Sequence, residues 1–306
     1  MKPFLSRQFV VSVALAALSC GAQSAIVFSL AENGNSLVRF DSSTPGTVTV
    51  VGAISGVASS LSGLDFRPAD GFLYGYQQSS SGIYRVNTST GATALVSTST
   101  ASTSGSQSGI DFNPTVDRLR VVSTNNNNLR INVDTGAATV DAALAYASGD
   151  TNFGTKPNIV DAAYTFSDRN PATGTTLYYI DSSLDTLVTT TNPNGGILNT
   201  VGALGFDTSQ LTGFDIFTDP NGINTAFASL TLQGNNSGLY TINLSTGAAT
   251  LIGAINARQL FGLAVAPTAI PEPGTLALFA LAGLAAFGIT RRRSAGGAGK
   301  TAATQA

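Results

Sequence analysis

The sequence predicts an all-β fold, a single β-propeller of five four-stranded blades, closed by pairing of strands from its N- and C-terminal ends. The first observation is a repeated unit, an alternating strand followed by a turn and a Thr-Gly step, at residues 82–93, 128–137 and 238–248. Alternating apolar residues bounded by Asn, Asp and Gly are typical of short strands joined by tight turns. We therefore expect copies of one small antiparallel sheet.

The second observation is the spacing of a short strand that opens each copy. Strands of the form Gly-apolar-Asp-apolar begin at Gly63, Gly109 and Gly213, and degenerate copies begin at Ala163 and Gly262. The starts lie 46, 54, 50 and 49 residues apart. A period of this length, with about four strands in each copy, is typical of propeller blades.

The third observation is that the two ends of the body are complementary fragments. Residues 26–30, 37–40 and 48–50 supply three strands of a blade without an opening strand, and residues 262–266 supply an opening strand without a blade. Pairing the two fragments completes a fifth blade and removes exposed sheet edges. An open β-solenoid or a pair of sandwiches is the alternative.

The third strand of each copy ends in an Asn or Asp residue that favours a turn. Such side chains accept hydrogen bonds from the backbone two residues further along, so this position requires no functional explanation. The predicted turn residues are Asp41, Asn87, Asp134, Asp181 and Asn243.

The composition excludes several classes of function. Residues 26–270 contain nine Lys or Arg and sixteen Asp or Glu, a net charge of about −7 that argues against nucleic acid as a partner. The chain has no His, and its single Cys, Cys20, lies in an N-terminal apolar segment. Nucleophilic sites built on His and the usual zinc sites are therefore not expected.

Both ends of the chain read as targeting segments. Residues 1–25 fit a signal peptide, with Lys2 and Arg7 before an apolar run and small residues at its end. The body, residues 26–268, precedes a segment at 269–293 in which residues 275–289 form an apolar run. A helix over that run is about 22 Å long, short for a bilayer core of about 30 Å. Residues 294–306 are expected to form a flexible tail.

The C-terminal segment resembles the PEP-CTERM sorting signal of Gram-negative bacteria. The resemblance implies export, transient anchoring in the inner membrane by a short transmembrane helix, processing by an exosortase-type enzyme, and release to the cell surface or matrix. Exopolysaccharide or matrix proteins are the further partners expected there. The resemblance rests on Pro271, Glu272, Pro273 and Gly274, and on Arg291, Arg292 and Arg293 after the apolar run.

The body resembles a family catalogued as a domain of unknown function in secreted bacterial proteins. That family implies a propeller-like repeat fold and no assigned activity. The matching residues are 109–114, 117–123, 128–132, 134–136, 177–181 and 185–188.

Three carboxylates recur at one position of the opening strands: Asp65, Asp111 and Asp215. Ring symmetry would bring them towards one axis, where they could bind Ca²⁺ or act as acid and base. The favoured interpretation is structural, because a residue repeated in every blade usually bonds to the backbone of its repeat. Glu32 is a further candidate.

Three arginines, Arg118, Arg120 and Arg130, fall within one copy of the repeat. Such a group could bind a carboxylate or sulfate of an acidic polysaccharide. The favoured alternative pairs them with carboxylates inside the fold. The candidate carboxylates are Asp111, Asp117 and Asp134.

Two functions remain for an exported, acidic, repeat-built body without His or Cys. The first is a non-catalytic surface or matrix module that binds polysaccharide or a partner protein and needs no cofactor. The second is a Ca²⁺-dependent propeller hydrolase, similar to lactonases or esterases, that uses the axial Asp residues.

Overall fold

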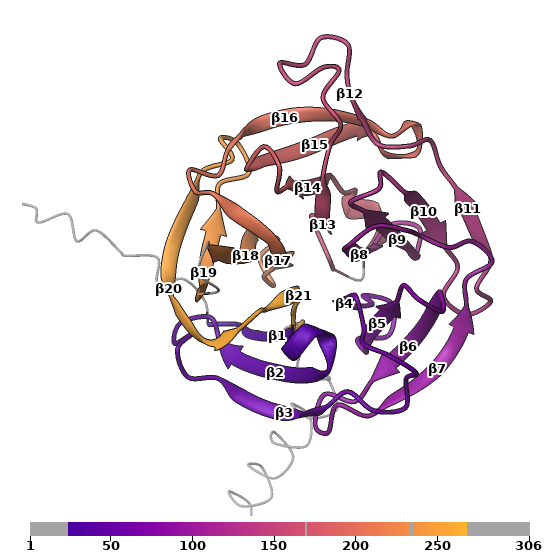
Figure 1. Cartoon of the computed structure of the whole chain (residues 1–306), viewed down its shortest axis with the longest axis vertical. Coiled ribbons are helices and arrows are strands. Elements are labelled where there is room, and N and C mark those ends of the chain that lie inside the picture. Colours follow the sequence, from indigo (N-terminus) through magenta and orange to yellow (C-terminus); the bar gives the residue numbers. More distant parts are fainter. Residues whose placement is uncertain (1–23, 169, 233–235, 268–306) are drawn as a thin grey trace, which may run out of the picture. The chain divides into compact units, whose positions relative to one another are not determined.

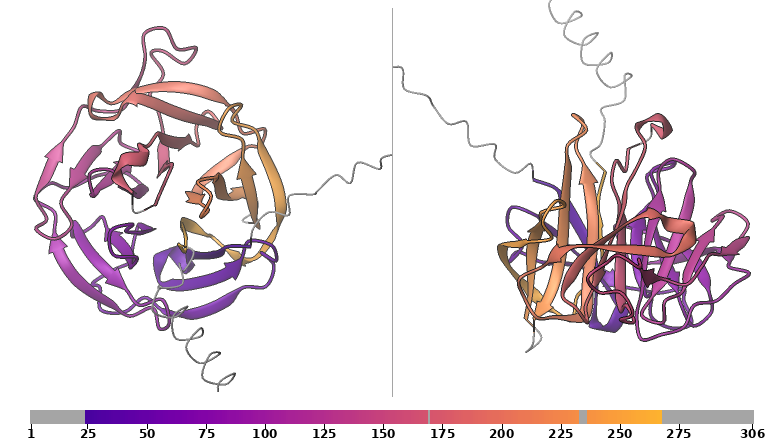
Figure 2. Two further views of the ribbon diagram at one scale, coloured as in Figure 1. Left: turned by 180° about the vertical axis from the view of Figure 1, so that it is seen from behind. Right: turned by 90° about the horizontal axis from the view of Figure 1, so that it is seen from above.

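The protein is a ring of five β-sheets (Figure 1). The computed structural model describes residues 24–267 except residues 169 and 233–235. Each sheet is one blade, with one strand at the ring axis and the others following outwards (Figure 1). In the edge-on view of Figure 2 the strands run roughly along the ring axis. The predicted five-bladed all-β propeller is confirmed.

The blades are numbered here along the chain, and their strands are given from the axis outwards. Blade 1 contains β21 (Phe261–Val265), β1 (Ile26–Ala31), β2 (Ser36–Asp41) and β3 (Thr49–Ala53). Blade 2 contains β4 (Gly63–Phe66), β5 (Leu73–Gln77), β6 (Gly82–Val86) and β7 (Thr93–Thr98). Blade 3 contains β8 (Ser108–Asn113), β9 (Arg118–Ser123), β10 (Asn128–Ile131) and β11 (Ala138–Val140).

Blades 4 and 5 follow in the same way. Blade 4 contains β13 (Ile159–Tyr164), β14 (Leu177–Asp181), β15 (Thr186–Asn192), β16 (Ile197–Ala203) and β12 (Ala145–Tyr146). Blade 5 contains β17 (Thr208–Thr218), β18 (Asn224–Leu232), β19 (Asn236–Ile242) and β20 (Ala249–Arg258). Short 3-10 turns lie at η1 (Glu32–Gly34), η2 (Pro171–Thr173) and η3 (Pro193–Gly195). Blade 4 thus has one strand more than predicted, because β12 pairs in parallel with β16.

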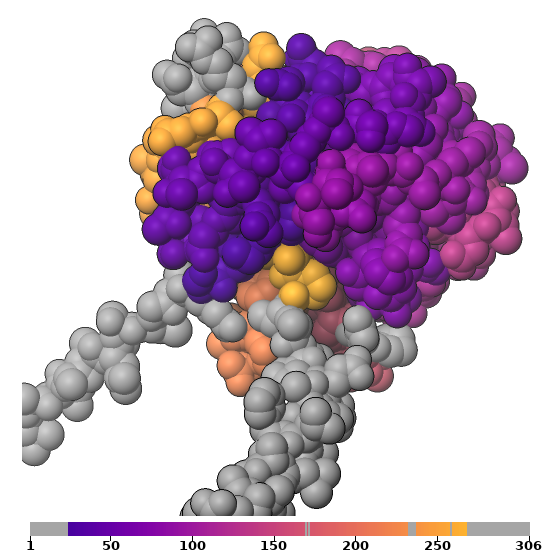
Figure 3. Space-filling view, turned by 90° about the horizontal axis from the view of Figure 1, so that it is seen from below, coloured from indigo at the N-terminus to yellow at the C-terminus, as the bar shows by residue number. Residues whose placement is uncertain are grey.

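The ring closes by pairing of its two ends. Strand β21 lies antiparallel to β1, with Val265 opposite Val27 and Ala264 opposite Phe28. Blade 1 is therefore built from both ends of the body, as the complementary fragments predict. Figure 3 shows blade 1, in indigo, side by side with blade 2, in purple. The edges that an open sheet would expose are thereby paired.

The turn after the third strand follows the repeat with one correction. Asn87 and Asn243 accept hydrogen bonds from the backbone N–H groups two and three residues further along. In blade 3 this position is held by Asn132, whose side chain accepts from the N–H groups of Asp134 and Thr135. The prediction of Asp134 as the turn residue was therefore wrong, and its carboxylate is free to bind elsewhere.

In blades 2, 3 and 5 the Thr-Gly step of the repeat lies against an outer strand of the preceding blade. Gly136 has a φ of +73°, and a Cβ atom there would lie 2.1 Å from the carbonyl oxygen of Thr98 in blade 2. Gly247 makes the same approach to Gly202 in blade 4, with a φ of +80°. Glycine is required at these turns because only glycine combines a left-handed backbone with so close a contact.

The hydrophobic core is divided into five clusters, one at each contact between adjacent blades. Between blades 2 and 3, for example, the rings of Tyr74 and Phe112 meet edge to face with centroids 5.4 Å apart. Alternate residues of a strand face opposite neighbours, so both faces of the inner strands are buried. This packing leaves the strand ends and the ring axis as the places for a site.

Most of the predicted targeting segments lie outside the described residues. The signal peptide falls almost entirely in residues 1–23, and the apolar C-terminal helix and the tail lie beyond residue 267. Within the part of the chain that the structure describes, no helix has the length and apolar character needed to cross a bilayer.

Candidate functional site

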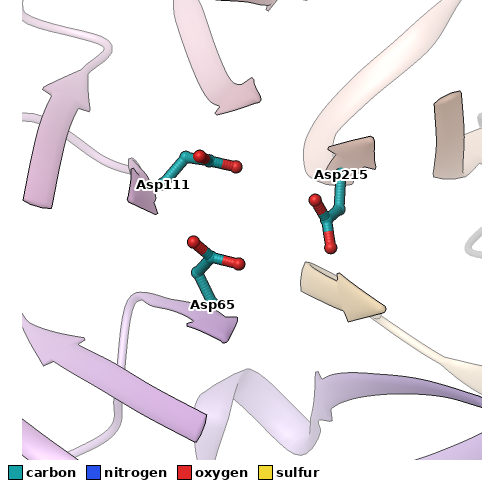
Figure 4. A group of neighbouring side chains, drawn as sticks. All are labelled: Asp65, Asp111 and Asp215. Carbon is teal, nitrogen blue, oxygen red and sulfur yellow. The ribbon is translucent and has the colours of Figure 1, made fainter. Parts of the chain in front are cut away.

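The first charged cluster lies at the ring axis and consists of Asp65 on β4, Asp111 on β8 and Asp215 on β17. These three residues, the axial carboxylates, point towards one another in Figure 4. One oxygen of each lies within 4.8 Å of the others, and all three side chains are buried. The repeat predicted this convergence, because equivalent positions of the innermost strands face a common axis.

Each axial carboxylate also bonds to the backbone of the next blade. The N–H of Phe112 in blade 3 donates to Asp65 at 2.7 Å, and the N–H of Val265 in blade 1 donates to Asp215 at 2.6 Å. Asp111 accepts in the same way from the N–H of Tyr164 in blade 4. Asp65 and Asp215 also accept from the N–H of the next residue of their own strand, Phe66 and Ile216. These bonds agree with the structural interpretation and extend it to the neighbouring blade.

The surroundings favour the protonated form of these acids. Burial raises the pKa of Asp65 and Asp111 well above the usual range, and repulsion from the neighbouring carboxylates adds to this effect. Burial also raises the pKa of Asp215, to about 6, against the opposing effect of two backbone N–H groups. The cluster can therefore lower its own charge by binding protons.

A further buried acid on an innermost strand, Asp161 on β13, was not among the residues predicted for the site. Its carboxylate accepts from the N–H of Phe214 in blade 5 at 2.9 Å and from the N–H of Ile110 in blade 3. The sequence placed the opening strand of blade 4 at 163–166, whereas β13 ends at Tyr164. Ala163 holds the position of the axial carboxylates, and Asp161 replaces the glycine of the repeat. The signal in the sequence was one Asp within an otherwise apolar run, which indicates a buried carboxylate with a structural partner.

The axial carboxylates fit a cation by chemistry, because Ca²⁺ prefers oxygen ligands. Six to eight oxygens are usual for Ca²⁺, however, and one oxygen on each of these residues already accepts a backbone hydrogen bond. Glu32 is exposed in η1 and is not a member of the cluster. Three carboxylates alone would leave most of the coordination to water.

The second charged cluster lies between blades 3 and 4, where Arg118, Arg120 and Arg130 line one cavity of about 220 Å³, the arginine cavity. Strand alternation places Arg118 and Arg120 on the same side of β9. The cavity lies at the end of β8, beside Asn113, and at the end of β13. Its remaining lining residues are Val116, Tyr164, Pro193 and Asn194.

Arg120 forms the buried wall of the cavity. Its side chain is 2% exposed, and it donates to Asp141 at 2.6 Å and to Asn128 at 2.7 Å. It also donates to Asn194 at 3.0 Å and to the hydroxyl of Tyr164 at 3.3 Å. The guanidinium is therefore held rigidly between two blades.

Arg130 shares the same counterion, with two bonds of 2.7 and 2.9 Å to Asp141. Burial raises the pKa of Asp141, but the bonds from Arg130 and Arg120 outweigh this effect, and the pKa lies below its usual value. Arg118, in contrast, donates only to the carbonyl oxygens of Val116 and Asp117 among the described residues. Arg120 and Arg130 thus share the carboxylate of Asp141, while Arg118 forms no ion pair with a described residue.

The carboxylates proposed as partners of these arginines bind elsewhere. Asp117 and Asp134 both pair with Arg67 of blade 2, at 2.6 and 2.9 Å, and so join blades 2 and 3. Asp111 remains at the axis. Arg120 and Arg130 do pair inside the fold, but with Asp141, so the predicted partners Asp111, Asp117 and Asp134 were wrong.

The family of the chain can now be stated. A family model described as "Domain of unknown function (DUF4394)" matches residues 36–264, almost the whole ring. The chain belongs to this family. The DUF4394 description carries no activity, so both charged clusters are sites without an assigned role.

A second family model, the PEP-CTERM protein-sorting motif, matches residues 269–293 of this DUF4394 protein. The motif implies export, transient membrane anchoring, and processing by an exosortase-type enzyme before release at the surface. Its residues lie outside the described part of the chain. They include Pro271, Glu272, Pro273, Gly274, Arg291, Arg292 and Arg293.

Solved structures similar to the DUF4394 ring share little sequence with it. A protein of unknown function from Bacteroides thetaiotaomicron VPI-5482 is 16% identical, with a TM-score of 0.44, over 75% of this chain and 58% of that one. A putative 6-phosphogluconolactonase from Bacteroides uniformis ATCC 8492 is 16% identical, with a TM-score of 0.39, over 76% and 83%. Hydrazine synthase from Kuenenia stuttgartiensis is 14% identical, with a TM-score of 0.39, over 65% and 52%. No curated protein matches the sequence.

Proposed function

We propose that this DUF4394 protein is a non-catalytic surface or matrix module that binds an acidic saccharide through the arginine cavity. The observation that carries the proposal is the charge balance of the cavity. Among the described residues, Asp141 is the sole carboxylate in an ion pair with Arg118, Arg120 or Arg130. An anion in the cavity would compensate the remaining positive charge.

The chemistry of the lining suits a carboxylate or sulfate group. Guanidinium groups bind such oxyanions through paired hydrogen bonds that are stronger than those between neutral groups. Arg120 and Arg130 are fixed by Asp141, while Arg118 makes bonds only to carbonyl oxygens. A volume of about 220 Å³ admits one sugar acid rather than a longer segment. A uronate residue at a chain end matches these properties.

The test measures binding of digalacturonate to the purified full chain by calorimetry. Arg118→Met should weaken binding at least tenfold, about 1.4 kcal/mol. Arg39→Met is the matched control, since Arg39 is an exposed arginine on β2 of blade 1. Equal affinity in the wild-type protein and Arg118→Met would refute the proposed site.

A Ca²⁺-dependent hydrolase is the second candidate, because three carboxylate oxygens lie within 4.8 Å at the axis. Ca²⁺ at 100 times its dissociation constant would then stabilise the folded state by about 2.7 kcal/mol. We expect no such change in melting temperature. A Ca²⁺-dependent shift that disappears in Asp111→Asn would favour the hydrolase, and hydrolysis of lactones and esters should then be assayed.

A further inference from the structure

A second hollow lies at the opposite end of β8 from the arginine cavity. It has a volume of about 630 Å³ and is formed where the innermost strands of blades 1, 2, 3 and 5 begin. Ser62, Gln107 and Phe261, for example, lie at the first residues of β4, β8 and β21 or just before them. This hollow, the polar funnel, takes no lining residue from blade 4.

The lining of the polar funnel is hydrophilic but uncharged. Ten of its thirteen residues are Ser, Gln or Asn, and the other three are Leu61, Leu211 and Phe261. Hydroxyl and carboxamide groups both donate and accept hydrogen bonds. The side chains of Asn33, Ser60 and Gln107 make no hydrogen bond to any other described residue, so they are available to a ligand. A charged ligand would find no counterion among these groups.

The rim of the funnel is held in place by bonds between blades. Ser106 of blade 3 donates to Gln210 of blade 5 at 2.5 Å, and Gln78 of blade 2 donates to the carbonyl oxygen of Gly105 at 2.9 Å. A lining that is already ordered loses less conformational entropy when a ligand binds. These bonds indicate that the rim is already ordered before a ligand binds.

The axial carboxylates add no positive charge to this end of the ring. Asp65 and Asp111 lie two residues beyond Gly63 and Gly109, along the strands that begin at the funnel. Neither these acids nor the lining of the funnel offers a positive charge to an anion, whereas a neutral ligand needs none. The funnel's volume falls within the usual range of small-molecule sites, about 300–1,000 Å³.

We propose that the polar funnel binds a neutral saccharide of about two sugar units. Sugar hydroxyls donate and accept in the same way as the Ser, Gln and Asn side chains that line it. The apolar side chains of Leu61, Leu211 and Phe261 offer contact to the C–H groups of a sugar ring. This site is separate from the arginine cavity and does not depend on the function proposed for it.

The test uses the purified full chain with maltose, cellobiose and lactose as probes, and glucosamine as the cationic comparison. At least one neutral disaccharide should bind, and the double variant Gln107→Ala, Gln210→Ala should weaken that binding at least tenfold. Ser60→Ala, which removes a hydroxyl without a partner, should weaken it about threefold. Thr139→Ala on β11 is the control, because its exposed side chain lies on the outermost strand of blade 3.

The outcomes separate this proposal from the arginine cavity. Loss of neutral binding in the Gln107→Ala, Gln210→Ala variant with unchanged digalacturonate binding would support a separate funnel site. The proposal is overturned if no neutral disaccharide binds, if binding survives in both the double variant and Ser60→Ala, or if glucosamine alone binds.

Discussion

The two charged clusters of the ring are built from the same repeat but balance their charge in opposite ways. The axial carboxylates are three buried acids, and burial raises their pKa values, to about 6 for Asp215, so that they take up protons more readily than exposed acids. The arginine cavity holds three guanidinium groups that stay charged at every relevant pH. The acids can lower their charge by binding protons, whereas the arginines keep theirs and need an anion to balance it. This difference is why the cavity, rather than the axis, carries the proposed function.

The largest effect is expected from removing the counterion of the arginines. Asp141→Asn leaves the buried guanidinium of Arg120 without its carboxylate, since Asp141 is itself only 4% exposed. Breaking a buried ion pair from one side costs about 3–5 kcal/mol. Urea unfolding followed by circular dichroism measures this loss. If the free energy of unfolding falls by less than about 1 kcal/mol, the positive charges of the arginines do not depend on Asp141 for compensation.

The same variant also tests whether an anion can replace the carboxylate. Digalacturonate added to Asp141→Asn should recover part of the lost stability, because no other described carboxylate forms an ion pair with the arginines of the cavity. Neutral disaccharides at the same concentration are the control and should not restore it.

The fold could be predicted from the sequence because the repeat determines local structure. Alternation and turn residues predict the strands, and the incomplete repeats at the two ends predict the closure between β1 and β21. The repeat also brought the axial carboxylates and the three arginines together. Contacts between blades were harder to predict from the sequence, because they depend on residues outside the repeat.

Two missed residues illustrate that limit. Asp141 follows β11 in a connection with no repeated position, so nothing in the sequence linked it to Arg120 and Arg130. Asp161 stands where the repeat has glycine, and its side chain accepts from blades 3 and 5 in addition to the N–H of Ala162 in its own strand. The tertiary arrangement of blades, not strand propensity, determines both contacts.

An intermediate effect is expected at Asp161, which tests whether buried acids of the axis act as links between blades. Asp161→Ala leaves the N–H groups of Phe214 and Ile110 without their acceptor. Unsatisfied buried donors cost about 1–3 kcal/mol each, so a loss of about 2–3 kcal/mol is expected. Asp161→Asn keeps one acceptor oxygen and should lose less. Equal losses in the two variants would contradict this role.

The pH dependence of stability tests the self-neutralising acids. A folded pKa of about 6 for Asp215 exceeds the unfolded value of about 3.9, so the folded state holds the proton more tightly. The resulting stabilisation is complete below about pH 4 and is lost as the pH rises through 6. From pH 5 to pH 7.5, the free energy of unfolding should fall by about 1.4 kcal/mol from Asp215 alone.

The matched comparison for this pH dependence is Asp215→Asn against Asp219→Asn. Asp219 lies in the turn after β17, and hydrogen bonds from Ile223 and Asn221 lower its pKa, so it does not titrate between pH 5 and 7.5. Asp215→Asn should flatten the dependence and Asp219→Asn should preserve it. Stability that rises between pH 5 and 7.5 in the wild-type protein would show that the axial acids remain ionised.

The smallest effect on stability is expected at Arg118, the arginine of the cavity that forms no ion pair among the described residues, although its charge helps to lower the pKa of Asp134. Arg118→Met keeps the aliphatic part of the side chain and removes a guanidinium bonded only to two carbonyl oxygens, so the free energy of unfolding should change by less than about 0.5 kcal/mol. Urea unfolding measures this beside Asp141→Asn. If Arg118→Met destabilises the ring by more than about 2 kcal/mol, the third arginine is structural like the other two. The excess charge of the cavity would then be part of the fold and not a site awaiting an anion.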